Sequence, residues 1–204
     1  MARSDSSTRW RTTTGKNRIV MFHPESEPVT LRRDVDAVII PAGEPVQLHE
    51  GTDGYITQAL GGSFTVYIDG NLFRISGQDA DALGKEPVAA PEAPQNATDE
   101  DIEKIVEKQL RSCYDPEIPI NIVDLGLIYR CDIAREDDNQ RSIAVEMTLT
   151  APGCGMGEIL VHDVQSKLAI IPTVATVKVE LVFDPPWNHS MMSDEARLQT
   201  GMMY

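Results

Sequence analysis

Cys154 is the cysteine whose surroundings are most favourable for chemistry. It lies in the segment Thr150-Ala151-Pro152-Gly153-Cys154-Gly155-Met156-Gly157, between a predicted strand and a predicted helix. The glycines permit a tight turn and leave little bulk around the thiol. Unpaired backbone N–H groups at a helix start lower the pKa of a thiol, and the thiolate binds metals or attacks electrophiles. The alternative is a buried structural cysteine, which is the interpretation that we favour for Cys113 and Cys131.

A second set of candidate residues is acidic. Asp115 and Glu117 lie in Asp115-Pro116-Glu117-Ile118-Pro119, and Asp124 opens Asp124-Leu125-Gly126-Leu127. The prolines restrict the backbone and could hold these carboxylates in place. Carboxylates beside a thiolate could serve iron, although like charges would raise the pKa of the thiol. The alternative is that Asp115 and Asp124 cap turns through their own side chains.

Trp187 follows two consecutive prolines in Asp184-Pro185-Pro186-Trp187-Asn188-His189. A tryptophan on such a stiff segment could lie across a site or anchor a partner. It could equally cover the end of the hydrophobic core. His189 stands among polar residues without ligand spacing to another histidine, so we expect it to be solvated rather than metal-bound.

Motifs for nucleotide, dinucleotide, zinc-protease and serine-hydrolase chemistry are not found in the sequence. With one well-placed cysteine, the chain cannot supply the four thiolates that usually hold a stable iron–sulfur cluster. Iron or a cluster bound here would need ligands from a partner, a second subunit or side chains other than cysteine.

The elements that must position these residues divide the chain into four predicted regions. Residues 1–28 are predicted to be a disordered polar tail, and 29–84 a small β module of short strands cut by glycine turns. Within the module, Asp69-Gly70 between two alternating runs predicts a hairpin with a type I′ turn. Residues 85–97 form a Pro/Ala linker, and 98–204 a second domain.

Hydrophobic periodicity predicts the order α-β-β-α-β for residues 98–204. Thr98 is the expected N-cap of the first helix, and Pro172 ends the second. Strands are expected at 127–133, 142–149 and 174–183, with a charged connection at 135–141. The predicted fold class is α+β, a C-terminal two-layer domain preceded by a small all-β module.

Composition excludes several functions. The formal net charge is −14, and residues 98–204 carry nine Lys and Arg against nineteen Asp and Glu. Such acidity argues against binding to nucleic acid or to an anionic membrane surface. No apolar run approaches the roughly 20 residues that span a bilayer, and no apolar signal-peptide segment is seen. Three cysteines without a CxxC motif suit a reducing compartment, so we expect the cytoplasm.

Three segments of the C-terminal region together resemble the metal–sulfur cluster biosynthetic domain, the family of PaaD-like proteins and SufT-type assembly factors. They are Asp115–Tyr129, Thr148–Gly157 and Asp184–Arg197. In the N-terminal region, Ile40–Pro45, Thr57–Gly62 and Asp79–Gly84 resemble the extension of the SufT subgroup. The resemblance implies an auxiliary role in maturing iron–sulfur proteins, rather than a primary scaffold or sulfur donor. It implies that the family's cysteine falls on Cys154.

Our leading hypothesis is a non-enzymatic assembly factor in which Cys154 transiently ligates iron or a cluster, or docks a partner that carries one. The alternative is a metal-free adaptor that recruits assembly machinery to client proteins. A thiol enzyme would need a general base, and no histidine is visibly placed for it. Residues predicted to shape the site or contact a partner are Asp115, Glu117, Asp124, Thr150, Gly153, Gly155 and Trp187. Expected partners are the assembly machinery, client apo-proteins and a second copy of the chain, paired through exposed strand edges.

Overall fold

The computed structural model describes residues 26–94, 97–115, 117–136, 140–151 and 156–201. Most of the predicted tail therefore lies outside the described residues. Residues 85–94 contain no helix or strand, as a linker would require. The boundaries of the four predicted regions stay a prediction. None of the described helices is long and apolar enough to cross a membrane.

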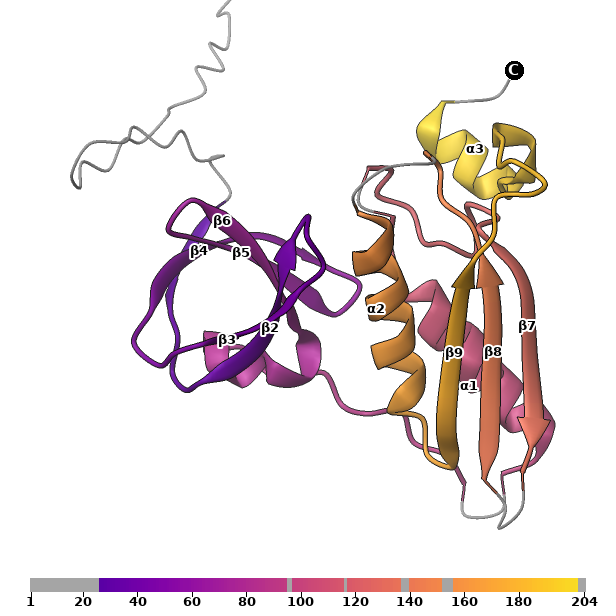
Figure 1. Cartoon of the computed structure of the whole chain (residues 1–204), viewed down its shortest axis with the longest axis horizontal. Helices are drawn as coiled ribbons and strands as arrows, with labels where there is room; N and C mark the ends of the chain where they lie inside the picture. The colour runs from indigo at the N-terminus through magenta and orange to yellow at the C-terminus, as the bar shows by residue number, and fades with distance from the viewer. Residues whose placement is uncertain (1–25, 95–96, 116, 137–139, 152–155, 202–204) are drawn as a thin grey trace, which may run out of the picture. The chain divides into compact units, whose positions relative to one another are not determined.

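The N-terminal unit is built on one six-stranded sheet, which Figure 1 shows curled around its buried face. The strand order is β1-β4-β5-β6-β2-β3, and a short 3₁₀ segment, η1, follows. The predicted turn between β5 and β6 is confirmed, because Asp69 and Gly70 both have positive φ, 48° and 93°. The bounds are β1 Glu27–Thr30, β2 Val35–Ile40, β3 Pro45–Leu48, β4 Asp53–Leu60, β5 Ser63–Ile68, β6 Asn71–Ser76 and η1 Gly77–Leu83.

The C-terminal unit has the predicted α-β-β-α-β order, followed by two short helical segments that the sequence analysis did not anticipate. Strands β7 and β8 are antiparallel, while β8 and β9 are parallel, so the sheet is mixed. The predicted fold class, an α+β C-terminal domain preceded by a module built on a β-sheet, is therefore confirmed. The bounds are α1 Asp99–Arg111, β7 Ile128–Arg135, β8 Arg141–Met147, α2 Gly157–Ala169, β9 Val174–Leu181, η3 His189–Met191 and α3 Asp194–Thr200.

The core of this unit lies between the helices and one face of the sheet. The central strand contributes Ile143, Val145 and Met147, each at most 1% exposed. Both helices add residues at four-residue spacing, so each presents one apolar side to the sheet. Burial of each such side chain contributes about 1.5–3 kcal/mol. The helical residues are Ile102, Val106 and Leu110 of α1, and Leu160, Val164 and Leu168 of α2.

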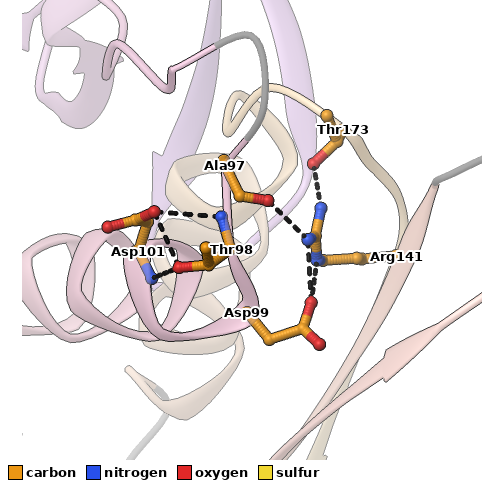
Figure 2. Close-up of polar contacts among 6 residues, drawn as sticks. All are labelled: Ala97, Thr98, Asp99, Asp101, Arg141 and Thr173. Carbon is orange, nitrogen blue, oxygen red and sulfur yellow. Dashed lines mark hydrogen bonds and ion pairs between the residues drawn. The ribbon is translucent and has the colours of Figure 1, made fainter.

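Arg141 is a buried cation that joins distant parts of this unit (Figure 2). Its guanidinium is 1% exposed and donates to Asp99 Oδ1 at 2.8 Å, Thr173 Oγ1 at 2.9 Å and the Ala97 carbonyl at 3.2 Å. Thr173 has a φ of 73°, which is uncommon for a β-branched residue. The Arg141 backbone N–H also donates to the Thr173 carbonyl, so one residue fixes this turn twice.

The start of α1, beside Arg141, is capped as predicted. Thr98 accepts a hydrogen bond from the Asp101 N–H, and the Asp101 carboxylate accepts one from the Thr98 N–H. This reciprocal pair satisfies backbone donors that the helix itself leaves free. Figure 2 shows the capping pair next to the guanidinium.

Replacing Arg141 with Ala should destabilise the C-terminal unit by about 2–5 kcal/mol, because a buried cavity forms and the acceptors around it lose their donor. Urea unfolding followed by Trp187 fluorescence, in a Trp10→Phe background, measures this. Arg130→Ala is the matched control: Arg130 pairs with Asp132 on an exposed strand face, so its loss should change the midpoint little. Equal losses for the two variants would contradict the role of burial.

Candidate functional site

The chain joins β8 to α2 through the segment that the sequence analysis singled out. Strand β8 ends at Met147 and α2 begins at Gly157, so the predicted strand-to-helix connection is confirmed for its described ends. Cys154, with Gly153 and Gly155, lies outside the described residues. The N-cap residue Met156 makes no side-chain hydrogen bond to the first turn of α2. Met156 therefore does not cap the polarised N–H groups of that turn with its own side chain.

Asp115 is buried against this connection and is 4% exposed. Its Oδ1 accepts hydrogen bonds from the backbone N–H groups of Glu117 and Ile118, at 2.9 and 2.7 Å. Its Oδ2 accepts one from Thr150 Oγ1 at 3.3 Å. The turn-capping interpretation is thus confirmed for Asp115. The same carboxylate also links that turn to Thr150, which follows β8. Burial raises the pKa of Asp115 above its ordinary value, and the hydrogen bonds only partly oppose this.

A small hollow lies between the two segments. The described residues that line it include the acidic pair Asp115 and Glu117, then Leu149–Ala151 on one side of the connection and Met156–Gly157 on the other. Glu117 is exposed, whereas Asp115 is buried. Three predicted site residues, Asp115, Glu117 and Thr150, are therefore brought together.

Asp124 belongs to a neighbouring polar network and is not among the described residues that line the hollow. Its carboxylate accepts hydrogen bonds from Arg111 at 2.8 Å and from the Asn121 side chain at 2.6 Å. Partial burial opposes ionisation, but these two hydrogen bonds outweigh it and lower the pKa of Asp124. The sequence analysis missed Asn121, whose Oδ1 accepts from the Asp124 N–H. The Asn-x-x-Asp spacing of a reciprocal cap was the available signal.

Trp187 closes over the Asp124-Leu125-Gly126 turn. Its indole N–H donates to the Leu125 carbonyl at 2.7 Å, and its ring packs partly buried against the core. The ring also meets His189 edge to face, with centroids 5.2 Å apart. These contacts show that Trp187 covers the end of the hydrophobic core. Its role as an anchor for a partner stays a prediction.

Gly126 allows the C-terminal segment to lie on this turn. Its φ is 70°, and a Cβ atom added there would overlap the backbone carbonyl of Met191. The Ser193 N–H donates to the Asp124 carbonyl at 2.8 Å beside it. Glycine is thus required both for backbone conformation and for the close approach of a second chain segment.

The other two cysteines have structural surroundings. Cys113 is fully buried in the core, and its thiol lies 3.6 Å from the Gln109 carbonyl. Cys131 is half-buried on β7, where burial first, and then Asp132 and Glu103, raise the pKa of its thiol. Both are therefore placed as structural cysteines are, at least partly buried against the core. Among the described residues, no group of three or more metal-binding side chains is gathered.

Comparison with known proteins identifies the family. Residues 103–180 match the model of the iron–sulfur cluster assembly protein family. A Porphyromonas gingivalis Fe-S protein maturation auxiliary factor is 43% identical over 101 residues, which are 92% of its length and 50% of this chain. This chain belongs to the iron–sulfur cluster assembly family. The resemblance of the C-terminal motifs is thereby confirmed.

Two further relatives carry the same description. The auxiliary factor SufT of Staphylococcus aureus is 40% identical over 88 residues, 96% of its length and 43% of this chain. The auxiliary factor YitW of Bacillus subtilis is 38% identical over 93 residues, 87% of its length and 46% of this chain. Their names describe auxiliary factors and no enzymatic activity. These matches span about half of this chain, so the N-terminal resemblance to SufT-type extensions stays a prediction.

Removing the Asp115 side chain should destabilise the protein by about 1–3 kcal/mol, because Asp115→Ala leaves the Glu117 and Ile118 N–H groups without an acceptor. Asp115→Asn keeps that acceptor and removes the charge. Since the folded pKa is raised, wild-type stability falls as pH rises from the unfolded value through the folded one. The Asn variant lacks this loss, so its stability relative to wild type should increase between pH 4 and pH 7 in urea titrations. A pH-independent difference would contradict the raised pKa.

Gly126→Ala should destabilise the C-terminal unit more than Gly201→Ala does. Both glycines have φ near 70°, so both substitutions incur the left-handed penalty of about 1–2 kcal/mol. Of the two, only Gly126 brings the new methyl against another backbone segment, since no described residue lies within 4 Å of the site at Gly201. Urea unfolding monitored by Trp187 fluorescence compares them, and equal effects would show that contact with Met191 is unimportant.

Proposed function

We propose that this protein is an auxiliary factor in iron–sulfur protein maturation that holds iron or a cluster transiently, as cargo, through the Cys154 thiolate. The observation that supports this most is the hollow beside the β8–α2 connection. Described residues on both sides of the connection line it, together with Asp115 and Glu117. The family match supplies the pathway.

The covalent chain limits how far Cys154 can be from this hollow. Two residues of extended chain reach roughly 7 Å, and Cys154 is two residues from Met156. Met156 itself lines the hollow and precedes the first turn of α2. We therefore propose that the thiol works at the start of α2, where helix N–H groups favour the thiolate.

The carboxylates have different proposed roles. The oxygens of Asp115 already accept three hydrogen bonds, so Asp115 acts by holding Thr150 and the turn in place. Glu117 is exposed and lines the hollow, so its carboxylate is the second proposed ligand for an incoming metal ion. One thiolate and one carboxylate leave a cluster incompletely ligated, so the partner supplies the remaining ligands and cargo is held briefly. Gly153 and Gly155 are proposed to keep the thiol approachable.

A metal-free adaptor is the second candidate, favoured by the fixed position of Trp187 at the same end of the domain. In that case the protein brings assembly machinery to client apo-proteins, and Asp124 and Trp187 matter more than Cys154. A cytoplasmic location is proposed because the described cysteines are free thiols and the relatives are bacterial maturation factors. The homodimer stays a prediction, and β7 and β9 are the edge strands of the described C-terminal sheet.

Anaerobic reconstitution with iron and sulfide should give thiolate-to-iron absorption in the wild type and none in Cys154→Ser. Cys131→Ser is the matched control and should keep the absorption, because its thiol is half-buried with a raised pKa. In cells that lack the protein, Cys154→Ser should fail to restore the activity of a client iron–sulfur enzyme. Identical spectra and equal rescue by Cys154→Ser would remove the thiol from the mechanism and favour the adaptor.

A further inference from the structure

The segment after β9 presents an exposed apolar ridge, defined here as Phe183–Trp187. Phe183 is 46% exposed, the two prolines that follow Asp184 are exposed, and Trp187 is half-buried. Large apolar side chains exposed together on a surface mark interaction sites more often than isolated ones do.

The ridge is held rigidly at three points. The Val182 N–H donates to the Met147 carbonyl at 2.8 Å, just before the ridge begins. Tyr129 donates its hydroxyl hydrogen to the Pro185 carbonyl at 2.7 Å, and the Trp187 indole is bonded to Leu125. A surface that is already ordered loses little conformational entropy when a partner binds, so more of the contact energy appears as affinity.

The ridge also lies at the end of the domain where cargo is proposed to be held. Met147 ends β8, and the chain runs from it into Thr148–Ala151, part of which lines the hollow. Figure 1 shows the ridge segment leaving the arrowhead of β9 at the end of the sheet where α2 begins. A partner seated on the ridge would therefore be close to the β8–α2 connection.

The charge around the ridge indicates what kind of partner it accepts. Three basic residues on β7, β9 and α3, namely Arg130, Lys178 and Arg197, already form ion pairs within the domain. Asp184, on the ridge itself, has no hydrogen bond or ion pair with any residue that the structure describes. Acidic residues also outnumber basic ones nineteen to nine in residues 98–204. The complementary surface is therefore positively charged around an apolar contact.

We propose that the Phe183–Trp187 ridge docks a partner-protein segment that presents an apolar side chain flanked by Lys or Arg. This inference rests on the proposed function, since the partner delivers or receives the cargo held at Cys154. The apolar side chain packs on Phe183 and the prolines, and the basic residues approach Asp184. Binding therefore depends on both apolar contact and charge.

Trp187 fluorescence in a Trp10→Phe background tests this with three synthetic peptides. The basic peptide is Lys-Lys-Phe-Leu-Lys-Lys; one control replaces its lysines with Glu, and the other replaces Phe-Leu with Gly-Ser. The basic apolar peptide should bind at least about tenfold more tightly than either control, and more weakly as salt increases. Failure of that peptide to bind, or equal binding of either control, would overturn the proposal.

Variants locate the binding surface. Phe183→Ser and Asp184→Lys should each weaken the basic apolar peptide about tenfold, and Asp184→Lys should also reduce the salt dependence. Leu198→Ser is the matched control, because Leu198 is 60% exposed on α3, outside the ridge, and its loss should leave binding unchanged. Equal weakening by Leu198→Ser, or no weakening by Phe183→Ser, would place the peptide elsewhere and overturn the proposal.

Reconstitution of Phe183→Ser with iron and sulfide separates the two proposals. If this variant keeps the wild-type absorption but no longer binds the peptide, peptide docking and iron ligation are separate properties of this end of the domain. Peptide binding that persists in Cys154→Ser, together with lost absorption, supports the same separation from the other side. Intact peptide binding by the ridge without any thiolate-to-iron absorption in the wild type would remove the cargo role alone.

Discussion

The register of the three-stranded sheet is the constraint on which the candidate site depends. Ile128, Met147 and Leu181 lie side by side at one end of the sheet, where β7 begins and where β8 and β9 end. Because β8 and β9 are parallel, both strands end at this end of the sheet. The antiparallel strand β7 begins there. The described parts of segments 115–129, 148–157 and 184–197 therefore meet at one end of the domain, although these segments are far apart in sequence.

At this end the segments are joined largely through backbone groups. Asp115 satisfies two N–H groups of its own turn and reaches Thr150, while Trp187 and Ser193 are bonded to the backbone of the 124–126 turn. A buried backbone group that loses its partner costs about 1–3 kcal/mol, more than a typical hydrogen bond contributes net. The polar residues of these motifs thus serve first to hold chain segments together. In our proposal, reactivity lies in the short connection between β8 and α2.

Local signals in the sequence predict the elements of this protein well and its long-range polar contacts poorly. The period of apolar residues, the Thr98 cap and the Asp69-Gly70 turn depend on residues close in sequence, and each prediction is confirmed. Helix α3 was missed although Ser193 caps it and acidic residues follow, because seven residues give too short a period. The predicted charged connection at 135–141 ends at Arg141, which is buried. Its burial depends on Asp99 and Thr173, which only the tertiary fold brings to it.

In the candidate site, too, contacts between residues close in sequence were predictable and long-range contacts were not. The capping role of Asp115 was open to prediction because its donors are two and three residues away. The link to Thr150 spans 35 residues, and the pairing of Asp124 with Arg111 depends on where α1 ends. The proposed cargo role needs ligands from a partner, because the three cysteines of the chain are too few to hold a cluster. Rigid fastening of the surrounding segments suits that role, because a partner then meets a surface that is already ordered.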